Sequence, residues 1–166
     1  MTDETPFGRW GTVIQPGEGR GFWQPLPSRG FVEVLLDPTN SPYDGFSCGT
    51  QTLPPGCHVR EHGHERNHEL IHIISGSGRC QIEDAEHRVG PGSTILFGRH
   101  ARHLLENDGT TDMTLFWVFM PPGLEDWFSA IGRPRLPGEA MPEPFARPDD
   151  VAEVQARMRF VAPKPR

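Results

Sequence analysis

Short apolar runs separated by turn residues cover most of the chain from residue 21 onward. They are GFWQPL, GFVEVLL, FSCGTQTL, HELIHII, GRCQI, STILF, HLLEN and TLFWVFM, and Gly, Pro, Asp and Asn stand between them. Regular short strands with such turn signals are typical of a β-sandwich or barrel. The composition agrees, because 19 glycines and 18 prolines with a 35% hydrophobic share favour many short strands over a helical bundle.

The pattern changes after Pro121 and Pro122. In GLEDWFSAIG the apolar positions recur at helical spacing, and a proline-rich connector leads to a second short helix in DDVAEVQARM. The last residues, VAPKPR, are expected to be frayed. We therefore expect three regions: a loose N-terminal arm over residues 1–20, a barrel over 21–122, and a helix with a Pro-rich tail over 123–166, packed on the barrel or on a partner subunit.

The charge pattern excludes several classes of partner. The net charge is −6, the pI is near 5.7 and no segment carries a basic stripe, so neither nucleic acid nor an anionic membrane is an expected partner. The N-terminus has an acidic pair and no apolar segment typical of a signal peptide, and no run reaches membrane-spanning length. Cys48, Cys57 and Cys80 form no CxxC pair and are expected to be reduced thiols in a cytoplasmic protein.

The stretch HVREHGHERNHEL carries four histidines and three glutamates in thirteen residues. On an extended strand His58, His62 and His64 share one face, so two imidazoles at i and i+2 can bind one ion. Glu69 follows the turn ERNH and begins the next apolar strand, and a hairpin there would bring its carboxylate beside them. Taken alone, the stretch fits a metal site or a polar, solvated turn equally well.

A second segment, GSTILFGRHARHLLEN, resolves this ambiguity, because the two segments together resemble the cupin superfamily. The first cupin motif reads Gly, five residues, His-x-His, three or four residues, Glu, six residues, Gly. Every spacing is met here, at Gly56, His62, His64, Glu69 and Gly76.

The second cupin motif reads Gly, five residues, Pro-x-Gly, two residues, His, three residues, Asn. Gly92, His103 and Asn107 fit it in register. Gly98 and His100 replace the proline and the second glycine of the motif, so this turn departs from the family pattern. The segment PPGLEDWFSAIG is also loosely similar to the tails of quercetin-dioxygenase-like single-domain cupins.

The resemblance implies an all-β fold, the cupin-type double-stranded β-helix (jelly-roll) barrel with short C-terminal helices. It also implies that the metal ligands are His62, His64, Glu69 and His103. Three nitrogens and one carboxylate leave two positions on a six-coordinate ion, whereas they would close a tetrahedral zinc site. We therefore expect one divalent metal per chain and favour Fe(II) or Mn(II), with Ni(II), Co(II) and Zn(II) as alternatives.

Strand parity suggests what surrounds the metal. Six apolar side chains are candidates for lining a substrate pocket, with plain barrel core as the more usual role of each: Ile71, Ile73, Ile95, Phe97, Leu105 and Trp117. His100 lies three residues before His103 and is a candidate second-shell catalytic group, with an exposed surface histidine as the alternative.

Three functions fit these observations. The first is a dioxygenase that oxidises or cleaves a small aromatic, enol or diketone-type substrate bound to the metal, with O2 as second substrate. The second is a non-redox isomerase, lyase or decarboxylase that uses the ion as a Lewis acid. The third is a binding module for a small ligand without turnover. In each case the partner is a small molecule, and we expect a homodimer, because open sheet edges need covering.

Overall fold

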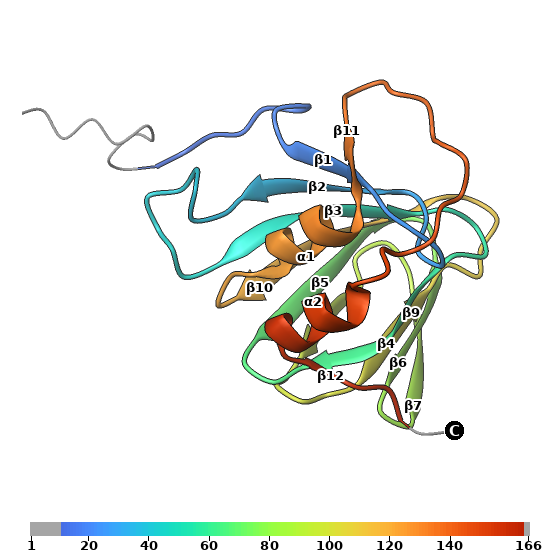
Figure 1. Ribbon diagram of the computed structural model, residues 1–166. Helices are drawn as coiled ribbons and strands as arrows, with labels where there is room; N and C mark the ends of the chain where they lie inside the picture. Colours follow the sequence, from blue (N-terminus) through green and yellow to red (C-terminus); the bar gives the residue numbers. More distant parts are fainter. Residues whose placement is uncertain (1–10, 165–166) are drawn as a thin grey trace, which may run out of the picture.

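Two antiparallel sheets face one another in the computed structural model, which describes residues 11–164 (Figure 1). The larger sheet has the spatial order β11 (Arg133–Arg135), β1 (Arg20–Trp23), β2 (Phe31–Leu36), β3 (Ser47–Leu53), β10 (Met113–Met120), β5 (His68–Ser75) and β8 (Thr94–Phe97). The smaller sheet has the order β12 (Phe160–Val161), β4 (His58–His64), β9 (His103–Glu106), β6 (Gly78–Ile82) and β7 (Ala85–Val89). Between β3 and β10 the chain crosses repeatedly from one sheet to the other, as in a jelly roll, and the predicted all-β cupin-type fold is confirmed.

Buried and partly buried side chains alternate along the central strand β10. On β10 the inward residues Met113, Leu115, Trp117 and Phe119 are at most 2% exposed, and their neighbours are only partly buried. Because side chains on a strand point to opposite faces in turn, this alternation requires one buried and one outer face. The core therefore lies between the sheets, and a polar residue at an inward position enters an apolar environment.

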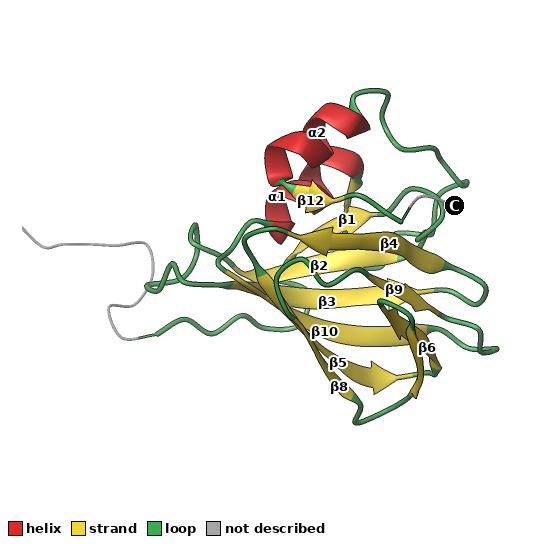
Figure 2. Cartoon of the chain, turned by 90° about the horizontal axis from the view of Figure 1, so that it is seen from below, coloured by secondary structure: helices red, strands yellow, loops and turns green. Residues whose placement is uncertain are grey.

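Two short helices, α1 (Leu124–Ile131) and α2 (Val151–Met158), follow the barrel strands. The predicted helical spacing is confirmed in α1, where Leu124, Trp127, Phe128 and Ile131 are all buried. Helix α1 packs against β3 and against α2, and Figure 2 shows both helices together at one side of the barrel beside β12. Among the described residues, no helix is long and apolar enough to cross a membrane.

The C-terminal segment closes one edge of the smaller sheet. Strand β12 pairs antiparallel with β4, so that Phe160 lies opposite His64. Further along, the backbone N–H of Lys164 donates to the Glu61 carboxylate at 2.8 Å. The expectation that residues 161–166 are frayed is thus wrong for Val161, which belongs to β12, and for Lys164, which is held by Glu61. Residues 165–166 lie outside the described residues.

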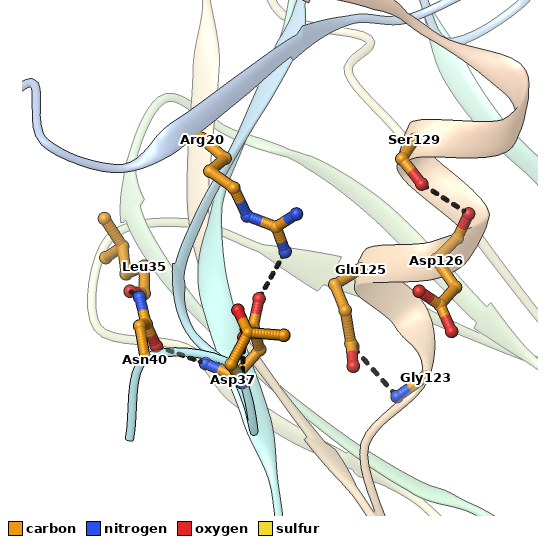
Figure 3. A network of polar contacts seen from close by, with 9 residues as sticks. Arg20, Leu35, Asp37, Asn40, Gly123, Glu125, Asp126 and Ser129 are labelled. Carbon is orange, nitrogen blue, oxygen red and sulfur yellow. Dashed lines mark hydrogen bonds and ion pairs between the residues drawn. The ribbon is translucent and has the colours of Figure 1, made fainter. Parts of the chain in front are cut away.

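Polar contacts fix the turn after β2 and the start of α1, as Figure 3 shows. The buried Asp37 carboxylate accepts a hydrogen bond from the Arg20 guanidinium, and the Asn40 side chain accepts one from the Asp37 backbone at 2.9 Å. At the helix, the Gly123 N–H donates to the Glu125 carboxylate at 2.8 Å, which satisfies one N–H group before the first helical turn.

Two sequence expectations about the rest of the chain have different outcomes. The three cysteines are all free, in agreement with the expectation of reduced thiols. The division into arm, barrel and tail stays a prediction, and residues 1–10 of the arm lie outside the described residues.

Candidate metal centre

The four side chains expected to bind a metal converge inside the barrel. His62 and His64 come from β4, His103 lies on β9 directly opposite His62, and Glu69 reaches across from β5 in the other sheet. Each residue offers one nitrogen or oxygen atom, and these four atoms all lie within 4.8 Å of one another. Glu69 Oε2 is 3.0 Å from His64 Nε2 and 3.2 Å from His103 Nε2. We call these four residues the HHEH cluster; that they bind an ion remains a prediction.

Backbone carbonyls orient two of the three imidazoles. The Nδ1–H of His62 donates to the carbonyl of Arg60 at 2.8 Å, and that of His103 donates to the carbonyl of Ala101 at 2.9 Å. In each ring this assignment leaves Nε2 with its lone pair free for a cation. The local strand conformation thus selects the tautomer that a metal ligand needs.

Burial and mutual contacts set the protonation states of the cluster. Burial lowers the pKa of His62 well below its usual value, and the neighbouring His103 and His64 lower this pKa further. Burial alone would raise the pKa of Glu69, but the close contacts with His103 and His64 outweigh it and hold that pKa below its usual range. A neutral imidazole beside an ionised carboxylate is the pairing that a divalent cation requires, so the donors present fit such an ion.

Aromatic rings enclose the cluster. Phe97 stacks on His103 with ring centroids 3.8 Å apart, and Phe119 meets His64 edge-on at 4.7 Å. Phe160 of β12 lies 5.1 Å from His64 and 5.7 Å from His62. These contacts restrict rotation of the imidazoles and separate the cluster from bulk water on several sides.

A cavity of about 40 Å³ adjoins the cluster, and its lining residues include His62, Glu69 and His103. Helix α1 closes it with Leu124, Trp127, Phe128 and Ile131. This volume holds only a few water molecules. Trp127 and Phe128 therefore dock α1 on the barrel and also cover the chamber.

The apolar residues expected to line the pocket divide into two groups. Ile71 and Leu105 line the cavity. The other four are buried but are not among its lining residues: Ile73, Ile95, Phe97 and Trp117. Parity assigns a residue to the interior of a barrel, whereas its height along the barrel axis decides whether it reaches the chamber.

Sequence reasoning missed the polar side chains of the chamber, which are Gln24, Ser28, Gln51 and Arg147. Gln51 alone carried a signal, because it shares strand parity with the buried Leu53 of β3. The side-chain amide of Gln51 makes no hydrogen bond with the described part of the chain, so this group is available to a ligand. The others lie in irregular segments, where strand parity says nothing about direction.

A β-bulge in β4 explains why the side chain of His58 points to a different face of the strand than predicted. In the β4–β9 pair, Val59 lies opposite Leu105 and His62 opposite His103, so three steps on β4 match two on β9. Because of the extra residue, Val59 shares the chamber with His62. The expectation that His58 and His62 face the same way is wrong, and His58 lines an outer groove instead.

His100 lies outside the chamber. Its side chain is exposed, and its backbone N–H donates to the carbonyl of His64 at 2.8 Å. Its φ is +65°, the left-handed conformation that glycine favours. The turn thus departs from the cupin pattern in residue type but keeps a backbone suited to the glycine of the motif.

A double-stranded β-helix with three histidines and one glutamate converging inside it defines a cupin with a candidate mononuclear metal centre. Comparison with known families agrees: residues 49–119 match the family model described as a cupin domain, which supports the cupin superfamily.

Two relatives and one solved structure illustrate the likeness. The chain is 32% identical over 80 residues to L-ectoine synthase of Rhodococcus opacus (strain B4), a match that covers 47% of this chain and 58% of the relative. It is 26% identical over 125 residues to the tetracenomycin polyketide synthase protein TcmJ of Streptomyces glaucescens, with 74% and 78% covered. A predicted oxalate decarboxylase from Thermotoga maritima has a TM-score of 0.55 at 23% identity over 66% of this chain and 98% of that one, a likeness of fold alone.

Proposed function

We propose that the protein is a metal-dependent enzyme that binds a small enol or diketone-type substrate through two oxygens and oxidises or cleaves it with O2. The observation that carries this proposal is the convergence of the HHEH cluster beside a mostly apolar, helix-covered chamber. A bound Fe(II) or Mn(II) ion would supply Lewis-acid activation of the substrate oxygens and one-electron chemistry towards O2. The chain itself supplies the donors, the exclusion of water and the contacts that orient the substrate.

The chamber offers few groups for acid–base catalysis. Its titratable lining residues are His62, Glu69 and His103, which are the proposed ligands, together with Arg147. An isomerase or lyase needs a separate acid or base, whereas an acidic enol that loses its proton on binding does not. This supports an enolisable substrate and favours O2 chemistry over proton shuttling.

The names of the relatives support one part of the proposal and challenge another. A polyketide chain contains β-dicarbonyl units, which enolise and offer two oxygens to one ion, so the likeness to TcmJ supports a diketone-type substrate. Both relatives, however, carry the word synthase in their names. That favours the second candidate, a non-redox isomerase, lyase or decarboxylase.

Oxygen uptake separates the two candidates. Protein loaded anaerobically with Fe(II) or Mn(II) would be mixed with acetylacetone, catechol or a flavonol while dissolved O2 and substrate are followed together. We expect O2 and substrate to disappear in step, and His103→Ala to abolish both. The matched control is His72→Ala, because His72 bonds to Thr94 on the outer face of β5. Substrate loss that continues without O2 would overturn the dioxygenase proposal in favour of the non-redox enzyme.

A further inference from the structure

Arg147 joins the inner chamber to a second, outer pocket. It lies in the connector between β11 and α2, outside the residues that match the cupin domain. Its side chain lines the chamber of the HHEH cluster and also an outer pocket of about 170 Å³. Val59, His62 and Trp127 line both spaces too, so the two are neighbours across these four side chains.

The Arg147 guanidinium has no anionic partner in the described part of the chain. No carboxylate among residues 11–164 lies within ion-pair distance of it, and its buried Nε has no hydrogen-bond partner there. It lies over the Trp127 ring, 5.4 Å from the centroid. Burial, with a smaller effect of Arg60, lowers its pKa to about 10, so it stays cationic at neutral pH.

A partly buried cation without a counterion is unfavourable, and stacking on an aromatic ring offsets only part of the cost. An oxyanion placed against the free N–H groups would remove this penalty. The planar guanidinium fork matches the two oxygens of a carboxylate.

The charge around the outer pocket indicates a single negative charge on the ligand. Its charged lining residues are Arg60, Arg147 and Glu61, which together carry a net charge of +1. Glu61 is also engaged by the Lys164 backbone N–H. One carboxylate balances this set, whereas a phosphate dianion would exceed it.

We propose that Arg147 binds a carboxylate at the end of the substrate remote from the oxygens that approach the HHEH cluster. The substrate class is therefore an enol or diketone acid whose chain runs from the inner chamber past Trp127 to the outer pocket. This inference rests on the proposed function for the position of the other end of the substrate, while the carboxylate contact itself depends only on Arg147.

Binding of a matched pair of probes tests the inference. Succinylacetone is a β-diketone with a terminal carboxylate, and its methyl ester lacks the charge. Affinities for metal-loaded protein are measured by calorimetry with wild type, Arg147→Gln, Arg147→Lys and Arg157→Gln, the last an exposed arginine of α2 as matched control. In parallel, the Nε–H resonance of Arg147 is followed by NMR as each probe is added.

We expect Arg147→Gln to weaken succinylacetone binding by about ten- to a hundredfold and to leave the ester unchanged, since charge-assisted hydrogen bonds are lost. Arg147→Lys should retain part of the affinity, and Arg157→Gln should retain all of it. If the methyl ester binds only to metal-loaded protein, but Arg147→Gln does not weaken the binding of succinylacetone, this inference is wrong and the proposed function stands. If succinylacetone shifts the Arg147 resonance but the ester does not bind, the proposed function fails and this inference stands; no binding of either probe contradicts both.

Discussion

At the scale of single residues, His100 occupies a backbone conformation that suits another amino acid. A side chain with positive φ costs roughly 1–2 kcal/mol compared with glycine, although glycine loses more entropy on folding. His100→Gly is therefore expected to raise the free energy of unfolding by up to about 1 kcal/mol in urea denaturation. The side chain lies outside the chamber, so metal content should not change. A destabilised variant would show that the imidazole makes a contact worth more than the strain.

Asn107 has a structural role that the cupin motif does not reveal by itself. Its buried side-chain amide donates to the carbonyls of Leu53 at 2.7 Å and Thr111 at 2.9 Å, and its oxygen accepts from the Gly109 N–H at 3.0 Å. Asn107→Ala leaves these backbone groups without partners.

We expect Asn107→Ala to lower the free energy of unfolding by about 2–4 kcal/mol, because each buried unsatisfied group is costly. Urea denaturation of this variant would be compared with that of Asp44→Ala, an exposed loop change that should stay within about 0.5 kcal/mol of wild type. Equal stability of the two variants would refute the structural role.

The sequence predicts the positions of the candidate ligands better than it predicts those of the residues around them. His62, His64 and Glu69 lie close together in the sequence, so their short spacings indicate that they can meet. The expected hairpin is wrong, because β4 and β5 belong to different sheets and Glu69 reaches the histidines across the core. Arg147 reaches the same chamber from an irregular, proline-rich connector. No periodicity describes the direction of its side chain, and only the packed structure reveals it.

At the scale of elements, β12 extends the smaller sheet and brings Phe160 against the HHEH cluster. Phe160→Ala would open this side to water, so a chromogenic chelator should remove bound metal several-fold faster than from wild type. Val161→Ala is the matched control, because Val161 follows on the same short strand and lies over Gly63 on the other face. Equal rates for the two variants would mean that Phe160 does not shield the site.

The sequence predicted helix α1 correctly, because its apolar residues repeat at helical spacing. It failed to predict the side-chain directions in β4, because one extra residue interrupts the alternation of that strand. The spacing of Leu124, Trp127 and Phe128 predicts α1 and its buried face correctly. The bulge in β4 shifts the face of Val59 and His58 by one position, and nothing in the local pattern of HVREHGH marks it. Because both faces of this strand carry polar residues, the sequence offers no apolar face from which the direction of each side chain can be assigned.

At the scale of the whole molecule, the jelly roll explains why the site is internal. Glu69 belongs to the larger sheet and the three histidines to the smaller one, so the cluster spans the core between them. The regular strands predicted a β-sandwich or barrel, and the resemblance of the two motifs to those of cupins implied this particular barrel. It could not predict the small volume of the chamber, since α1 and the connector that close it are placed by tertiary packing.

The central claim is that the HHEH cluster holds one divalent metal ion. Elemental analysis of protein purified without added metal tests it most directly, with His62→Ala and Glu69→Ala as loss variants and His72→Ala as the outer-face control. The account predicts iron, manganese or nickel at about one per chain in wild type and His72→Ala, and loss in both cluster variants. Zinc in place of these would support the non-redox enzyme. Absence of metal from wild type, even after anaerobic loading with Fe(II), would contradict the account.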